Sequence, residues 1–167
     1  MNHRAHFTFF FVLSSFTLGL PAPLQADAPK GYSNYAYDQA FRLAKKSGRN
    51  VFLYFGREGC AFCSLSNKKT FRLQSVRKLI LKNYEMAYAD SEGGRRLTLP
   101  DGERITEMQL GEKMNVLGTP VFLILDPRGK ELVRFTGILK PEDFRALHSF
   151  IVGGAYRRMK FSDYKPK

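Results

Sequence analysis

The sequence has few of the residues that build metal centres. Its 167 residues include two cysteines, Cys60 and Cys63, and three histidines. A structural zinc site takes about four such ligands, and beyond the first 28 residues only His148, far along the chain, could join the two cysteines. One chain therefore supplies no zinc site, and the sequence predicts no metal. A c-type haem site is excluded as well, because it needs a histidine directly after the second cysteine and Ser64 stands there.

The sequence also lacks an apolar run long enough to cross a bilayer. The candidate, Phe7 to Leu20, is shorter than the roughly 20 residues that a transmembrane helix needs. It follows a weakly basic start and precedes an A-x-A motif, Ala26 to Ala28, which is the layout of a secretory signal peptide. We expect residues 1–28 to be this signal peptide, with a retained anchor as the alternative. Residues 29–167 then form one exported domain, in a compartment where disulfides persist.

Acidic residues are scarce. The chain has 27 lysines and arginines against 15 aspartates and glutamates, a net charge of +12. This balance favours acidic partners or membrane head groups, although a solvated basic surface is the simpler interpretation. We exclude nucleic acid as a partner, because the basic residues are spread along the chain, no nucleic-acid-binding motif is present, and the export signal argues against access.

The first half of the chain predicts buried strands alternating with helices. Two apolar runs read as strands that are covered on both faces. Small polar residues before the periodic segments are candidates for helix caps. The expected elements are a helix capped at Ser33 or Asn34 and ended by Gly48, a strand from Asn50 to Gly56, a helix from Cys60, a helix capped by Ser75, and a strand from Tyr84 to Asp90.

The second half predicts a hairpin, a helix and two more strands. The polar stretch Ser91 to Ile105 contains a PDG turn and suggests the hairpin. Thr106 and Gln109 form a capping box that opens a helix to about Met114. A buried strand from Gly118 to Asp126, an antiparallel partner from Glu131 to Gly137 and a closing helix from Pro141 to Val152 follow. The order predicts an α/β fold with a central mixed sheet flanked by helices.

The two cysteines, separated by two residues, fall at the predicted turn from a strand into a helix. A cysteine reacts as its thiolate, and the first turn of a helix offers free N–H groups and the positive end of the dipole to hold that charge. Arg57, Lys68 and Lys69 lie near in sequence and are candidates to strengthen this field, or are ordinary surface cations. A structural disulfide is the alternative, but so small a loop constrains the unfolded chain little.

The CxxC motif, together with the proline that opens the third main strand, resembles the thioredoxin fold over nearly all of residues 29–167. The segments Leu97 to Phe122, Gly137 to Phe144 and Val152 to Tyr164 look like the periplasmic thioredoxins of the SoxW type. The resemblance implies a periplasmic thiol-disulfide oxidoreductase whose cofactor is its own redox-active disulfide.

The resemblance also implies roles for particular residues. Cys60 attacks a partner disulfide, and Cys63 resolves the mixed disulfide. Pro120, if its peptide bond is cis, places Thr119 beside the pair, where its backbone can pair with an extended partner segment. Phe62 is a candidate for exposure beside the pair. We therefore expect Thr119, Pro120 and Phe62 to bind the substrate.

The chain departs from thioredoxins in two places. Tyr54 stands where thioredoxins commonly carry a buried acid that assists proton transfer at the second cysteine. Glu58 is the nearest carboxylate in sequence, but it reads as a surface residue. The dipeptide Ala61-Phe62 replaces the Gly-Pro of cytosolic thioredoxins, at the place where the family tunes redox potential and partner choice.

The resemblance favours a reductant of disulfides in exported proteins. An oxidant of the DsbA type carries a long helical insertion between the CxxC half and the proline half, whereas this chain has only the short stretch 91–105. The implied electron donor is a membrane protein of the DsbD or CcdA kind. The implied substrates are sulfur-oxidation carrier proteins or cytochrome c maturation proteins. The alternatives are a disulfide oxidase or isomerase of the Dsb type, and a binding or chaperone module without catalysis.

Overall fold

The computed structural model describes residues 28–166, so the predicted signal peptide lies almost wholly outside it. Within residues 28–166, no helix combines the length and the apolar character that a membrane span requires.

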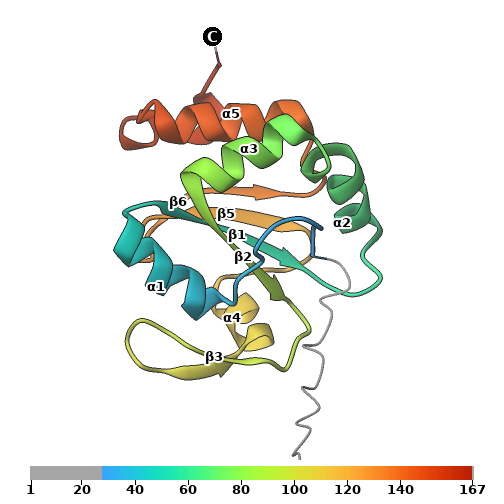
Figure 1. Cartoon of the computed structure of the whole chain (residues 1–167), viewed down its shortest axis with the longest axis vertical. Coiled ribbons are helices and arrows are strands. Elements are labelled where there is room, and N and C mark those ends of the chain that lie inside the picture. The colour runs from blue at the N-terminus through green and yellow to red at the C-terminus, as the bar shows by residue number, and fades with distance from the viewer. Residues whose placement is uncertain (1–27, 167) are drawn as a thin grey trace, which may run out of the picture.

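A four-stranded mixed sheet forms the centre of the molecule, with the order β2-β1-β5-β6 (Figure 1). Strand β1, Asn50–Gly56, runs parallel to β2, Tyr84–Asp90, and both bounds agree with the sequence prediction. Strand β5, Val121–Leu125, lies antiparallel to β1 and to β6, Glu131–Thr136. The carboxyl ends of β1 and β2 therefore lie next to the start of β5, at the same end of the sheet.

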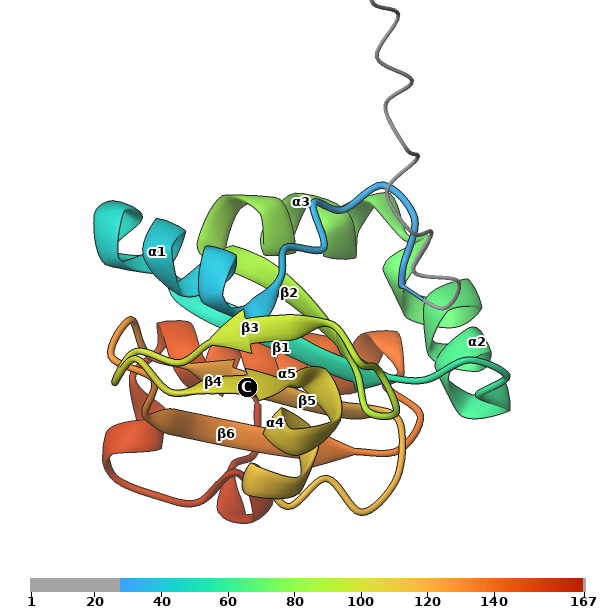
Figure 2. The same ribbon diagram turned by 90° about the horizontal axis from the view of Figure 1, so that it is seen from below.

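Helices cover both faces of the sheet, which Figure 1 views nearly edge-on and Figure 2 views from one face. The first face packs against α2 (Ala61–Ser66), the π-helix η1 (Asn67–Phe71), α3 (Gln74–Asn83) and α5 (Pro141–Val152). The second face packs against α1 (Tyr37–Ser47), α4 (Glu107–Lys113) and the hairpin of β3 (Arg96–Thr98) and β4 (Arg104–Thr106). Phe52 and Tyr54 of β1 enter the first core, while Leu53 and Phe55 enter the second. This burial on both faces explains the continuous apolar run.

Helix α1 begins later than the sequence predicted, and its predicted cap is wrong. Its N-cap is Ala36, without a side-chain hydrogen bond. The Asn34 amide instead donates to the Pro29 carbonyl over 2.8 Å. Tyr35 forms a parallel bridge with β2, accepting from the Tyr88 N–H and donating to the Met86 carbonyl. This pairing holds Tyr35 against β2 and outside the helix, so the helix starts after it and neither Ser33 nor Asn34 is its cap.

The predicted cap of α3 is wrong too. Its N-cap is Leu73, and Ser75 lies inside the first turn. The PDG hairpin and the capping box of Thr106 with Gln109 are both present, and α5 has the predicted bounds. Two short 3-10 helices, Ala155–Arg157 and Phe161–Asp163, follow α5, and Phe161 packs edge-on against Phe150.

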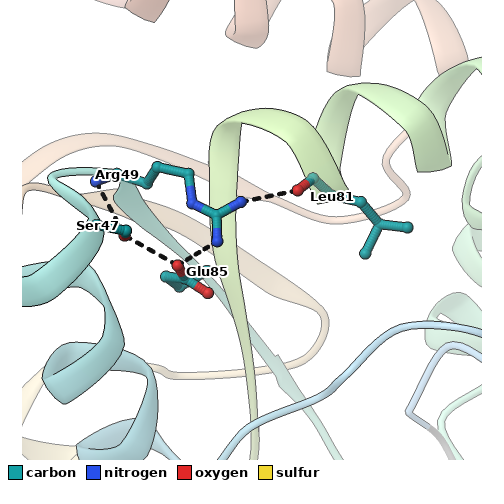
Figure 3. Close-up of polar contacts among 4 residues, drawn as sticks. All are labelled: Ser47, Arg49, Leu81 and Glu85. Carbon is teal, nitrogen blue, oxygen red and sulfur yellow. Dashed lines mark hydrogen bonds and ion pairs between the residues drawn. The ribbon is translucent and has the colours of Figure 1, made fainter.

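A buried carboxylate ties four elements together at the far end of the sheet (Figure 3). Glu85, near the start of β2, is 5% exposed and forms an ion pair with Arg49. It also accepts a hydrogen bond from the Ser47 hydroxyl over 2.9 Å, and Arg49 donates to the Leu81 carbonyl over 2.9 Å. The network joins the ends of α1 and α3 to the starts of β1 and β2, at the end of the sheet opposite the cysteines.

Candidate active site

Cys60 and Cys63 are joined in a disulfide at the turn from β1 into α2. Strand β1 ends at Gly56, and Gly59, with φ +70°, makes the turn that aims Cys60 at the helix. Cys60 is the N-cap residue of α2, so the helix begins one residue later than predicted, and its Sγ accepts the Cys63 N–H over 3.1 Å. The sulfur of Cys60 thus occupies the helix terminus, where negative charge is stabilised.

The two cysteines differ in exposure. Cys60 is 6% exposed, whereas Cys63 is fully buried in the apolar core of the first face. A partner sulfur can reach Cys60 from solvent, but it cannot reach Cys63. This difference is the one that separates an attacking cysteine from a resolving one.

Thr119 and Pro120 lie beside the pair, as the sequence predicted. Their peptide bond is cis, and Pro120 directly precedes β5. The Thr119 hydroxyl donates to the Sγ of Cys60 over 3.3 Å. The antiparallel pairing of β5 with β1, which sets Val121 opposite Phe55, brings these distant segments together.

An open groove of about 680 Å³ runs past Cys60. The CxxC turn, the loop after β2 and the segment before Pro120 form its walls; its lining includes Phe62, Ser91, Glu92, Leu117 and Thr119. Phe62 is 55% exposed, as predicted, while Phe55 is core. Sequence reasoning missed Leu117, which is 99% exposed. It also missed the wall from Ser91 and Glu92, which no motif marks.

The charges at the groove are partly neutralised. Arg57 of the CxxC turn and Glu92 of the loop after β2 form an ion pair with 3.6 Å between the nearest nitrogen and oxygen. The positive charge of Arg57 is therefore shared with a carboxylate. Lys68 and Lys69 are exposed on η1, beyond Cys63.

Tyr54 occupies a fully buried position in the same core as Cys63. Its ring stacks on Phe71 with 5.5 Å between centroids and meets Tyr88 edge-on at 5.3 Å. An aromatic cluster therefore takes the space in which thioredoxins commonly hold an acid.

The buried carboxylates among the described residues are Glu85 and Glu107, and neither lies in the core around Cys63. Glu85 is at the far end of the sheet. Glu107, on α4, packs on the second face and forms an ion pair with Arg95. Burial raises the pKa of Glu107, while the Arg95 guanidinium opposes that shift. The geometry therefore gives no buried carboxylate the proton role at Cys63.

Two hydroxyl groups clamp the CxxC helix to the loop before α5. Ser66 accepts the Leu139 N–H over 3.1 Å and donates to the Phe62 carbonyl over 3.0 Å. Thr70 donates to the Leu139 carbonyl over 2.6 Å. Both hydroxyl residues are fully buried, and both backbone groups of Leu139 are satisfied. Nothing in the sequence marks this clamp except the spacing of the two residues, which puts them on one helix face.

Across residues 28–166, the structure shows no group of three or more histidine, cysteine, aspartate or glutamate side chains arranged to hold a metal ion.

The sequence profile of the thioredoxin-like domain matches residues 37–151, which is more than half of the chain. The chain belongs to the thioredoxin-like family. No sequence among the curated proteins matches it at a significant level.

Solved structures agree with this family. A thioredoxin from Thermus thermophilus is 27% identical, with a TM-score of 0.58 over 72% of this chain and 88% of that one. A disulphide isomerase from Xylella fastidiosa is 19% identical, with a TM-score of 0.54 over 81% of this chain and 98% of that one. The C-terminal domain of DsbD from Neisseria meningitidis, in its oxidised form, is 15% identical, with a TM-score of 0.53 over 66% and 88%. This thioredoxin-like protein thus combines the fold and the CxxC disulfide of a thiol-disulfide oxidoreductase.

Proposed function

We propose that this thioredoxin-like protein is a periplasmic reductant of disulfides in exported proteins. One observation carries the proposal. The Sγ of Cys60 lies at a helix N-terminus, accepts hydrogen bonds from the Cys63 N–H and the Thr119 hydroxyl, and borders an open groove. These groups stabilise the thiolate that attacks a disulfide.

The reaction consists of two exchanges. The Cys60 thiolate attacks one sulfur of a partner disulfide, forming a mixed disulfide and releasing the other partner sulfur as a thiolate. The Cys63 thiolate then attacks the Sγ of Cys60 and releases the second partner thiolate, which takes up a proton from solvent. The partner gains two electrons, and the protein is left with the Cys60–Cys63 disulfide that the structure contains.

The groove supports a substrate-binding role for Thr119, Pro120 and Phe62. The backbone before β5 ends beside Cys60, where an extended segment of a partner can pair with it. The exposed Phe62 ring offers that segment an apolar contact.

The direction of the reaction rests on the chain between β2 and β5. This part contains a short hairpin and α4, which has seven residues, and no helical domain interrupts it. Oxidants of the DsbA type carry such an insertion. The likeness to the Thermus thioredoxin agrees with a reductant.

The location and the partners belong to the same proposal. Residues 1–28 have the pattern of a signal peptide, which would deliver residues 29–167 to the periplasm. A reductant in an oxidising compartment needs an electron source, and a membrane donor of the DsbD or CcdA kind would supply it. The resemblance to SoxW-type thioredoxins supports sulfur-oxidation carrier proteins or cytochrome c maturation proteins as substrates.

The test combines a reduction assay with a measured potential. The protein should accelerate the reduction of insulin by dithiothreitol, and Cys60→Ser should abolish this activity. Its reduction potential should be close to that of thioredoxin, about −270 mV. A value close to that of DsbA, about −120 mV, would make the protein an oxidant instead of a reductant. A binding or chaperone module would not accelerate the reduction at all.

The second candidate is a disulfide isomerase or oxidase of the Dsb type. The likeness to the Xylella isomerase favours it. It predicts recovery of activity from scrambled ribonuclease, which a simple reductant does not restore.

A further inference from the structure

The charge of the protein is unevenly distributed along the chain. Residues 61–83, which follow Cys60 directly, contain six basic residues and no acidic one. Those residues are Lys68, Lys69, Arg72, Arg77, Lys78 and Lys82, and all six are exposed. Half of the net charge of +12 thus lies in 23 consecutive residues.

These cations lie on one side of the molecule. They belong to η1, to α3 and to the turn between them, and Figures 1 and 2 both show this part of the chain as continuous with α2. We call the six residues together with Lys30 the α2–α3 basic face.

The cations of this face have no acidic partners. Within residues 28–166, none of them takes part in an ion pair. Elsewhere, Arg42 of α1 pairs with Asp38 and Arg134 of β6 pairs with Glu131, while exposed cations such as Lys45, Lys46 and Lys130 are in none of the ion pairs of residues 28–166. The six cations therefore form an unpaired stretch that begins beside the redox helix, at Lys68, and follows α3 to Lys82, next to the Leu81 carbonyl that Arg49 contacts.

The face is hollowed where it meets the start of the described chain. A cleft of about 480 Å³ is lined by Lys30, Lys68 and Arg72, together with Ser64 and Asn67 of the redox helix and its continuation, and no acidic residue lines it. The Arg77 guanidinium lies against Gly31, next to this cleft, at 3.1 Å from the place of a Cβ there. A concave, positively charged surface with hydroxyl and amide groups suits carboxylates.

We propose that the α2–α3 basic face docks an acidic surface of a protein partner, next to the disulfide that the partner presents to Cys60. This inference rests on the proposed function and adds the charge of the substrate to it. The groove at Cys60 carries charges of both signs, paired as Arg57 with Glu92, so its charge does not select a partner. The α2–α3 basic face, with positive charges alone, selects partners that carry negative charge.

Continuity with the redox groove favours a protein partner over a bilayer. Ala61 and Phe62 of α2 line the groove, while Ser64 and Asn67 line the basic cleft. At about 1.5 Å of rise per residue, less than ~10 Å along the axis separates the two sets. A protein whose disulfide has reached Cys60 necessarily brings neighbouring surface over the cleft. A bilayer brings no disulfide, and a flat surface does not fill a cleft.

The test uses two synthetic peptides with the same disulfide loop, one flanked by three aspartates and the other by three lysines. The reduced protein is mixed with each peptide, and each second-order rate constant is divided by that for hydroxyethyl disulfide, which is uncharged. This division removes changes in thiolate reactivity. The ratio of the acidic-peptide rate to the basic-peptide rate should be about ten at low ionic strength, and added salt should lower this ratio towards one.

Two variants of equal charge locate the effect. Lys68→Gln, Lys69→Gln and Arg72→Gln together should lower the ratio several-fold. The control combines Lys45→Gln, Lys46→Gln and Lys130→Gln, exposed cations at the opposite end of the sheet, and should leave the ratio unchanged. Equal rates for the two peptides, or equal losses in the two variants, would overturn the inference.

Two further results separate the alternatives. If the protein does not reduce hydroxyethyl disulfide either, the proposed function fails and the inference fails with it. The second result is equal rates for the two peptides together with binding to anionic vesicles. In that case the protein sediments with phosphatidylglycerol vesicles but not with phosphatidylcholine vesicles, and the triple variant at Lys68, Lys69 and Arg72 sediments with neither. The face then binds a bilayer, and a protein partner is ruled out.

Discussion

The Thr119 hydroxyl donates to the Sγ of Cys60 over 3.3 Å, although 59 positions separate the two residues in the sequence. The same sulfur accepts the N–H of Cys63. Two donors thus converge on the atom that carries negative charge when the disulfide is reduced. A hydrogen bond to the charged form of a group stabilises that form, so Thr119 is expected to contribute to the reactivity of Cys60.

Replacing Thr119 by Val should therefore raise the pH midpoint of Cys60 alkylation. One hydrogen bond to a charged sulfur corresponds to a rise of about one unit or less. The rate of iodoacetamide reaction, followed against pH in the reduced protein, measures it. Thr119→Ser keeps the hydroxyl and serves as the control. An unchanged midpoint in the valine variant would contradict the role.

Single-cysteine variants should separate the roles of the pair. Cys60 is slightly exposed and Cys63 is fully buried. Replacing Cys63 by Ser leaves the attack possible but removes the resolving thiol, so partner proteins should accumulate as adducts that added thiol releases. Replacing Cys60 by Ser should yield few adducts. Non-reducing electrophoresis of periplasmic extracts measures both, and equal trapping by the two variants would refute the assignment.

Replacing Gly56 by Ala should destabilise the protein without touching the cysteines. A Cβ at Gly56 would lie 2.6 Å from the Tyr88 hydroxyl, and Tyr88 is held in the core. Overpacking of this kind costs about 1–3 kcal/mol of unfolding free energy. Gly94→Ala, where a Cβ meets nothing within 4 Å, is the matched control and should be near neutral. Urea unfolding measures the free energy of unfolding of both variants, and similar losses in the two would contradict the prediction.

Replacing Glu85 by Gln should weaken the network of Figure 3. The change leaves Arg49 without its buried counter-charge. A charged hydrogen bond of this kind contributes about 1–3 kcal/mol. Asp38→Asn removes the more exposed pair with Arg42, which should cost about 0.5 kcal/mol or less. Thermal and urea unfolding compare the two, and the Glu85 variant should keep its activity because the network lies far from Cys60.

His148 should make the protein less stable in mild acid. Burial lowers the pKa of His148 in the folded protein, and the ring shares a hydrogen bond of 3.1 Å between its Nδ1 and the Tyr84 hydroxyl. Below the ordinary value of about 6.5, the unfolded chain binds a proton that the folded protein does not bind, so stability falls with falling pH.

The measurement is the change in unfolding free energy between pH 7.5 and pH 5.5, for the protein and for His148→Gln. The variant cannot titrate at this position, so its loss should be smaller. A loss as large as that of the unmodified protein would assign the acid sensitivity to other groups.

The sequence predicted β1 and β2 well because these strands are buried on both sides, whereas β5 begins at Val121 and not at Gly118, because the cis Thr119–Pro120 bond precedes it. The apolar runs of β1 and β2 end where polar residues or glycine follow, so their bounds could be stated in advance. The helix starts were less predictable. Ser33, Asn34 and Ser75 have the chemistry of caps, but the pairing of Tyr35 with β2 is a tertiary contact that no local pattern reveals.

In the candidate site too, the features set by a local motif could be predicted, and those set by tertiary contacts could not. Cys60, Cys63 and the Thr119–Pro120 bond could be placed because their motif fixes their geometry. The exposure of Leu117 and the clamp of Ser66 and Thr70 on Leu139 could not, because each depends on how distant segments pack. Loop walls and backbone clamps leave no periodic trace in a sequence.

The antiparallel pairing of β5 with β1 sets an order of events for the newly made chain. Cys60 leaves the ribosome well before Thr119, so the pair exists before the second wall of its groove. The two cysteines cannot be mispaired within the chain at any stage, because two cysteines allow one intramolecular disulfide. Oxidation within the chain before folding is complete therefore yields the same Cys60–Cys63 bond that the folded protein contains.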